Sequence, residues 1–175
     1  MKRTLILLLL FTLISPLFGQ TNPIDRLFDK YSGQEGFTSI YISSRMFSMI
    51  ARADMDDEEL QEIMNNLKSI RILTVDSLMV GQVNLYRELE NDMDFSKYEE
   101  LMVVKDGSTD LKFLIKEKGK RIEELLMIGG GDNGGNILLS IKGDLSLKNI
   151  SDISKKVGID ELEGIENSKK GKKYD

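Results

Sequence analysis

The chain has 175 residues, of which 41% are hydrophobic and 30% charged, and its formal net charge is −5. This length predicts one domain with a short segment at an end, and the composition excludes a disordered, collagen-like or multi-span membrane protein. The sequence contains neither cysteine nor histidine. Disulfides, thiolate nucleophiles, zinc or haem sites built on these residues, and imidazole acid–base chemistry are therefore excluded.

The first 19 residues have the pattern of an export signal. Lys2 and Arg3 precede an apolar stretch from Thr4 to Phe18, as in secretory signal peptides. The stretch is shorter than the roughly 20 apolar residues that a membrane-spanning helix needs, so we expect no stable membrane anchor. A buried N-terminal helix is the alternative interpretation. We predict cleavage near Gly19 and a periplasmic or secreted product.

Charge divides the remaining chain into two parts. Residues 20–166 contain 18 basic and 28 acidic residues, a net charge of −10, whereas residues 167–175 contain four lysines and one acid. An acidic body repels phosphate backbones and anionic lipids, so we do not expect a nucleic-acid partner. The predicted organisation is a signal peptide over 1–19, a single α+β domain over 20–166 and a disordered basic tail over 167–175.

Helical and strand patterns alternate in the first half of the domain. Asn22 and Pro23 are typical of a helix start, apolar residues follow at helical spacing, and Gly33 ends the pattern. Residues 37–43 are rich in β-branched and aromatic residues and predict a strand. Helices over 44–53 and 57–68, a strand over 69–76 and a helix over 83–93 follow.

Alternating patterns dominate after Tyr98. They predict strands over 101–105, 111–116, 122–128 and 137–141, with turns at Asp106-Gly107 and Lys118-Gly119. The sequence thus predicts a four-strand meander.

A last helix is predicted after the meander. Asp144 or Ser146 would cap it, Gly158 would stop it, and the residues expected to face the core are Leu147, Ile150, Ile153 and Val157. The predicted fold is α+β in two layers, with helices on one face of a largely antiparallel sheet and the two early strands joined by a helical crossover.

The acidic run from Asp54 to Glu59 contains the oxygen ligands that hard cations prefer. It does not match an EF-hand loop, because Glu59 stands where glycine is needed and Asn65 where an acid is needed. We interpret the run as a helix start, with Asp56 as the cap and acids in the first turn.

Two further motifs invite a functional interpretation. The segment from Gly129 to Gly135 continues into a strand pattern rather than a helix, so it predicts a flexible hairpin connection and not a phosphate loop. A role of this segment in partner contact stays open. Glu99-Glu100 and Glu123-Glu124 lie on predicted strands, where neighbours point to opposite faces, so neither pair is expected to act together.

Four methionines, at positions 46, 49, 64 and 102, lie on apolar stripes. We interpret them as core residues, with an adaptable binding groove as the alternative.

The end of the domain carries a family resemblance. The sequence ILLSIKGDLS over 137–146 and ISDI over 150–153, together with the order of elements and the export pattern, resembles the bacterial family labelled domain of unknown function 4252. The likeness extends from Asn22 to Ile165. It implies a small exported protein of a diderm bacterium. Many such proteins look like lipoproteins, whereas this chain lacks the lipid-bearing cysteine. No catalytic or binding residue follows from the resemblance.

The chain contains no Ser-x-x-Lys and no Gly-x-Ser-x-Gly motif. We therefore assign no catalytic, metal or cofactor-binding residue and expect no cofactor and no enzyme activity. The predicted function is that of an exported, non-catalytic protein-binding or structural module of the bacterial cell envelope, with another envelope protein as its partner. The alternatives are a metal-dependent hydrolase built on carboxylates such as Asp54, Asp56 and Asp106, or a small-ligand carrier with an apolar cavity.

Overall fold

The computed structural model describes residues 22–53, 57–76, 82–105, 107, 109–131, 136–146 and 148–149. The elements within them, in chain order, are α2 (Pro23–Tyr31), β1 (Phe37–Ser43), α3 (Ser44–Arg52), α4 (Glu58–Asn66), β2 (Leu67–Val75), α5 (Leu85–Asp92), the 3₁₀ turn η2 (Phe95–Lys97), β3 (Glu99–Lys105), β4 (Thr109–Lys118), β5 (Arg121–Gly131) and β6 (Ile137–Leu145).

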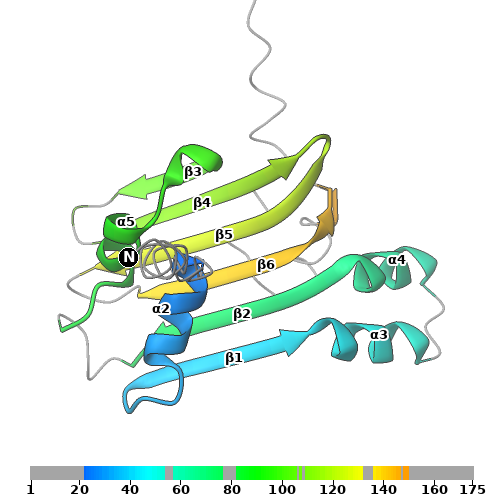
Figure 1. Ribbon diagram of the computed structural model, residues 1–175, viewed down its shortest axis with the longest axis horizontal. Helices are drawn as coiled ribbons and strands as arrows, with labels where there is room; N and C mark the ends of the chain where they lie inside the picture. Colours follow the sequence, from blue (N-terminus) through cyan, green and yellow to red (C-terminus); the bar gives the residue numbers. More distant parts are fainter. Residues whose placement is uncertain are drawn as a thin grey trace, which may run out of the picture.

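The strands form one open antiparallel sheet with the order β1-β2-β6-β5-β4-β3 (Figure 1). The predicted meander of β3 to β6 is confirmed. The connection between β1 and β2 is helical, as predicted, but it is not a crossover. The two strands are antiparallel neighbours, so α3 and α4 return the chain at the same end of the sheet.

Helix α2 begins and ends where the sequence predicts. The Asn22 side chain accepts a hydrogen bond from the Ile24 N–H at 2.9 Å, and Pro23 fills the first helical position, which needs no N–H donor. The Ser32 N–H donates to the Phe28 carbonyl at 2.8 Å and closes the last turn. The helix buries one apolar stripe against the sheet.

The core occupies both faces of the sheet. Helices α2 and α5 cover one face, which we call the helix face, and their apolar residues pack on Leu73, Leu114, Leu126, Ile128 and Leu138. Phe47 of α3 and Ile63 of α4 belong to a second cluster on the opposite face, together with Phe113, Ile115, Leu125, Met127, Leu139 and Ile141.

The prediction that the helices pack on one face is therefore wrong for α3 and α4. The central strands explain the error, because they are apolar at consecutive positions. In β5 every residue from Glu124 to Gly131 is buried, which is the pattern of a strand covered on both faces.

The junction of α4 and β2 differs from the prediction by a few residues. Asp57 caps α4, since its side chain accepts from the Leu60 N–H at 3.0 Å, in place of the predicted Asp56. Gly143 lies within β6, which extends past the predicted end of this strand at residue 141. A Cβ atom at this glycine would lie 2.6 Å from the Asn66 carbonyl oxygen, so Gly143 allows α4 to end directly on the sheet.

A reciprocal pair of hydrogen bonds follows β6. The Ser146 N–H donates to Asn149 Oδ1 at 2.8 Å, and the Asn149 N–H donates to Ser146 Oγ at 3.1 Å. This is the arrangement of a helix capping box, with Ser146 in the role predicted for it. The helix predicted beyond Asn149, and the segments 1–19 and 167–175, lie outside the described residues.

Gly130 allows the start of α5 to lie directly on β5. A Cβ atom at Gly130 would lie 2.8 Å from Tyr86 Cβ and 2.9 Å from the Tyr86 backbone nitrogen. Asn84, next to it, caps α5 by accepting from the Arg87 N–H at 3.0 Å. Gly129, Gly130 and Gly131 are thus buried strand residues and not part of a flexible connection, while residues 132–135 lie outside the described part of the chain.

Gly130→Ala is expected to lower the free energy of unfolding by about 1–3 kcal/mol, because the added methyl group must displace α5 from a packed interface. Urea denaturation measures the change. Val103→Ala, on an exposed edge strand, serves as the control and should change stability by less than about 0.5 kcal/mol. A Gly130→Ala protein as stable as the parent would contradict this role of the glycine.

Candidate functional site

The carboxylates of the predicted alternative metal site are not among the described residues. Asp54, Asp56 and Asp106 all lie in the gaps between them. Within the described part of the chain, no group of three or more acidic side chains could hold a metal ion. No helix in that part is long and apolar enough to cross a membrane.

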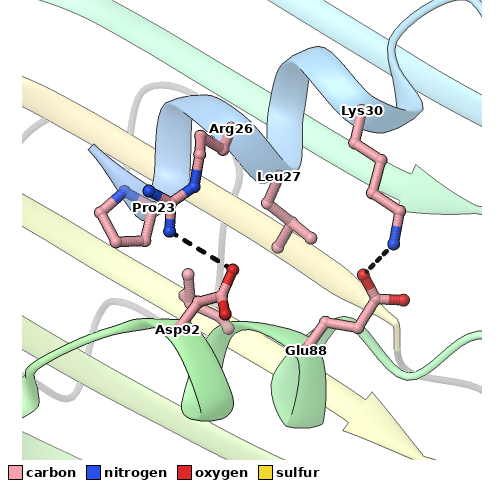
Figure 2. Close-up of a pocket in the computed structure, with 7 residues that line it drawn as sticks. Pro23, Arg26, Leu27, Lys30, Glu88 and Asp92 are labelled. Atoms are coloured by element: carbon pink, nitrogen blue, oxygen red, sulfur yellow. Dashed lines mark hydrogen bonds and ion pairs between the residues drawn. The ribbon is translucent and has the colours of Figure 1, made fainter. Parts of the chain in front are cut away.

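A groove between α2 and α5 is the first candidate site on the helix face. Its cavity has a volume of about 320 Å³ and lies between Pro23, Leu27 and Leu89. Figure 2 shows side chains of the two helices pointing toward each other across it. Charged and apolar side chains therefore line the groove together.

Ion pairs connect the two sides of this groove (Figure 2). Arg26 Nη2 lies 3.3 Å from Asp92 Oδ2, and Lys30 Nζ lies 2.7 Å from Glu88 Oε2. The Tyr31 hydroxyl also donates to Glu88. The hydrogen bond to Glu88 raises the pKa of Lys30 above its usual value. These contacts link α5 to α2, and they pair the basic side chains of the groove with its acidic side chains.

Two further cavities continue the groove past the start of α2. One has a volume of about 450 Å³ and the other about 200 Å³, and both are bordered by Asn22 and Lys116. Their walls are rich in charged residues, whereas a carrier of small apolar ligands needs mainly apolar walls. This part of the structure gives no support to the carrier alternative.

A buried carboxylate lies beside the smallest cavity. Glu124 of β5 is 2% exposed and accepts hydrogen bonds from the Tyr98 hydroxyl at 2.8 Å and the Ser140 hydroxyl at 2.6 Å. Lys142 Nζ lies 3.8 Å from Glu124 Oε1 and 3.3 Å from Asp25 Oδ1. Burial, followed by the nearby Glu124 charge, raises the pKa of the Tyr98 hydroxyl.

This network satisfies the buried charge and connects α2 to the centre of the sheet. Asp25 of α2 pairs with Arg71 of β2 as well as with Lys142 of β6. The Arg71 guanidinium also lies 5.5 Å from the centre of the Phe28 ring, at cation–π distance. We therefore interpret the network as structural, and the sequence pattern did not reveal it because its members lie far apart in the chain.

The expectation that Glu123 and Glu124 point to opposite faces is wrong. The register between β5 and β6 shifts between Ile122 and Glu124, as at a β-bulge, so Glu123 has no partner in the ladder. Its carboxylate lies 3.1 Å from Lys116 Nζ, and both glutamates border the smallest cavity. The hydrogen bond from Lys116 lowers the pKa of Glu123, which keeps this carboxyl ionised and unsuited to donate a proton near neutral pH.

The two edges of the sheet differ in their protection. Edge strand β3 carries Glu99, Glu100 and Lys105, and its register with β4 shifts between Glu100 and Met102. Charges and bulges on an edge strand hinder pairing with another chain. Edge strand β1 has no charged residue, and its register with β2 is continuous over all seven residues. Of the two edges of the described sheet, only β1 is therefore both uncharged and continuous in register.

Exposed apolar side chains gather on β1 and on the helix that follows it. Ile40 is 44% and Tyr41 57% exposed, and Met46 and Met49 of α3 are 50% and 60% exposed. Met46 and Met49 are three residues apart and so share one side of α3. Ile40 and Tyr41 point to opposite faces of the sheet, as neighbours in a strand do, and the Tyr41 ring lies 5.3 Å from the Arg71 guanidinium on the helix face. The name β1–α3 surface refers to the β1 edge together with these four residues. The interpretation of Met46 and Met49 as core residues is wrong.

The described residues form an α+β domain with an open six-stranded antiparallel sheet that has β1 at one edge and β3 at the other. The family model described as "Domain of unknown function (DUF4252)" matches residues 31–153, and the chain belongs to this family. The match runs from the end of α2 past the end of β6, and it confirms the resemblance seen in the sequence. No curated protein and no solved structure matches the chain.

Proposed function

We propose that the chain is an exported, non-catalytic protein-binding module of the bacterial cell envelope and that it binds its partner through the β1–α3 surface. The observation that carries this proposal is the uncharged, exposed edge strand β1 beside the exposed Met46 and Met49. Exposed apolar side chains are frequent at interaction sites, and an open strand edge accepts an extended segment of a partner as an added strand.

The backbone of β1 has the groups that strand addition needs. The Gly36 carbonyl accepts from the Asp76 N–H at 2.8 Å, so this residue pair bonds toward β2. In an antiparallel ladder the bonding direction alternates along the strand. The backbone groups of Ile40 therefore bond to β2, and those of Ser39 and Tyr41 face away from the sheet.

Two other features support this function. The N-terminal segment has the composition of an export signal, which favours the envelope or the exterior as the place of action. The groove between α2 and α5 has its charges engaged in ion pairs between the helices, which favours a structural over a catalytic role for it.

Photo-cross-linking in the native bacterium tests the proposal. A photoreactive phenylalanine derivative is placed at Tyr41 on β1 or, as the matched control, at Val104 on the other edge strand β3; both side chains are exposed. We expect discrete protein adducts in the envelope or exported fraction from position 41 and none from position 104.

The adduct from position 41 should also disappear when Ile40→Lys is added, because a lysine on the edge strand opposes strand pairing. Cross-linking that is equal from the two edges, or that persists in the Ile40→Lys variant, would overturn the proposed binding surface. Recovery of the protein only from the cytoplasm would overturn export.

A further inference from the structure

We infer that the partner of the β1–α3 surface is a second copy of this chain, joined by antiparallel pairing of the two β1 strands around a two-fold axis at Ile40. This inference rests on the proposed function and names the partner. Symmetric pairing of identical surfaces is the commonest way in which soluble proteins form dimers.

The bonding pattern of β1 fits its own copy. With Ile40 opposite Ile40, Ser39 of each copy lies opposite Tyr41 of the other, and Phe37 lies opposite Ser43. All four of these residues have outward-facing positions in the ladder, since they alternate with Ile40, which bonds to β2. The backbone hydrogen bonds of this register come from the two Ser39–Tyr41 pairs, because the Phe37 N–H already donates to the Gln34 carbonyl at 3.3 Å and Ser43 is the N-cap of α3.

The side chains in this register are also compatible with one another. Ile40 faces Ile40 as a non-hydrogen-bonded pair, where side chains approach most closely, and Thr38 faces Ile42. Aromatic Tyr41 lies opposite the small Ser39, so the two large rings do not collide. The exposed area of Ile40 would thus be covered by Ile40 of the second copy, and part of the exposed area of Tyr41 by its Ser39.

Charge favours a copy of this chain at β1 and nowhere else along the edges. The chain as a whole is acidic, with a net charge of −5, so two copies repel each other over most of their surface. The seven residues of β1 carry no charge. Pairing through β3 would instead bring Glu99, Glu100 and Lys105 together at a strand whose register is already shifted.

The ends of β1 carry opposite charges. Glu35 lies two residues before the strand and Arg45 two residues after it, and both are exposed. The register centred on Ile40 brings the end of β1 in one copy beside its start in the other. Arg45 of each copy therefore lies near Glu35 of its mate, and the two-fold axis forms this oppositely charged contact twice.

Analytical ultracentrifugation over a wide concentration range tests the inference on protein purified from cells that express the full chain. We expect a reversible dimer with twice the mass of the monomer. Ile40→Lys should raise the dissociation constant by about tenfold or more, because it replaces an apolar pair at the axis with like charges. The matched Val103→Lys variant at the β3 edge should leave the dissociation constant unchanged.

Charge exchange distinguishes this register from any other. Arg45→Glu alone should weaken the dimer several-fold, since it places two acids side by side at each end. Adding Glu35→Arg to Arg45→Glu should restore the parent constant. The inference would be overturned if the dissociation constant does not change with these substitutions, or if the Val103→Lys variant loses the dimer. It would also be overturned if the parent protein is a monomer at every concentration.

The two proposals fail in different ways. If the chain is a monomer but position 41 cross-links to another envelope protein, the second-copy inference is wrong and the binding function stands. If position 41 yields no adduct at all, the binding function itself is wrong. Circular dichroism of each variant confirms that the fold is retained, so that loss of the dimer is not loss of the structure.

Discussion

Ile141→Ala is expected to lower the free energy of unfolding by about 2–5 kcal/mol, as for a large-to-small change in a packed core. Ile141 is 1% exposed and lies in β6 between Ile70 of β2 and Leu125 of β5. It belongs to the core cluster on the face opposite α2 and α5. Denaturant titration followed by circular dichroism measures the loss.

Deletion of residues 167–175 is the control for this experiment. The segment has four lysines and one aspartate, and we expect its removal to leave the unfolding midpoint unchanged. An Ile141→Ala protein as stable as the parent, or a deletion that unfolds the domain, would show that the stabilising core lies elsewhere.

Tyr98→Phe is expected to lower the free energy of unfolding by about 1.5–3 kcal/mol, the range for a hydrogen bond to a charged group. The Tyr98 hydroxyl donates to the buried Glu124 carboxylate. When this hydroxyl is removed, Glu124 keeps the Ser140 hydroxyl and Lys142 as its partners. The ring itself is retained, so the change isolates the hydrogen bond. Urea denaturation at neutral pH measures it.

Tyr86→Phe is the comparison variant, because Tyr86 is also buried but its hydroxyl contacts Lys112 and the Glu90 carboxylate, the latter at 3.4 Å, rather than a buried carboxylate. We expect this variant to lose less than about 0.5 kcal/mol. Equal losses in the two variants would mean that Glu124 does not depend on Tyr98.

Local patterns in the sequence predicted the elements because each depends on neighbours along the chain. Asn22 and Pro23 cap α2 as predicted, and the alternation after Tyr98 predicted the meander. The order of the strands could not be predicted in this way. The pairing of β2 with β6, for example Ile72 with Leu139, joins residues far apart in the chain. The residue pattern of neither strand indicates which other strand it pairs with.

The candidate site was only partly accessible to sequence reasoning. Residues 37–43 predicted a strand, but the edge position of β1 follows from the sheet order alone. Met46 and Met49 match an apolar helical stripe, and only the packing of α3 shows that Phe47 is buried and they are not. The position of Glu123 depends on a register shift, which periodicity cannot reveal. The absence of charged residues in β1 was the one feature of the sequence that could have indicated an interaction edge.

The place of β6 has a consequence for how the chain folds. Among the described strands it is the last along the chain, yet it lies between β2 and β5 and separates the sheet into an early and a late part. Until β6 has been made, β2 has a strand neighbour only on its β1 side, and β5 has one only on its β4 side. The two parts of the sheet therefore cannot pair with each other. Such non-local pairing makes folding slow. We therefore expect the complete sheet to form only once β6 has been synthesised.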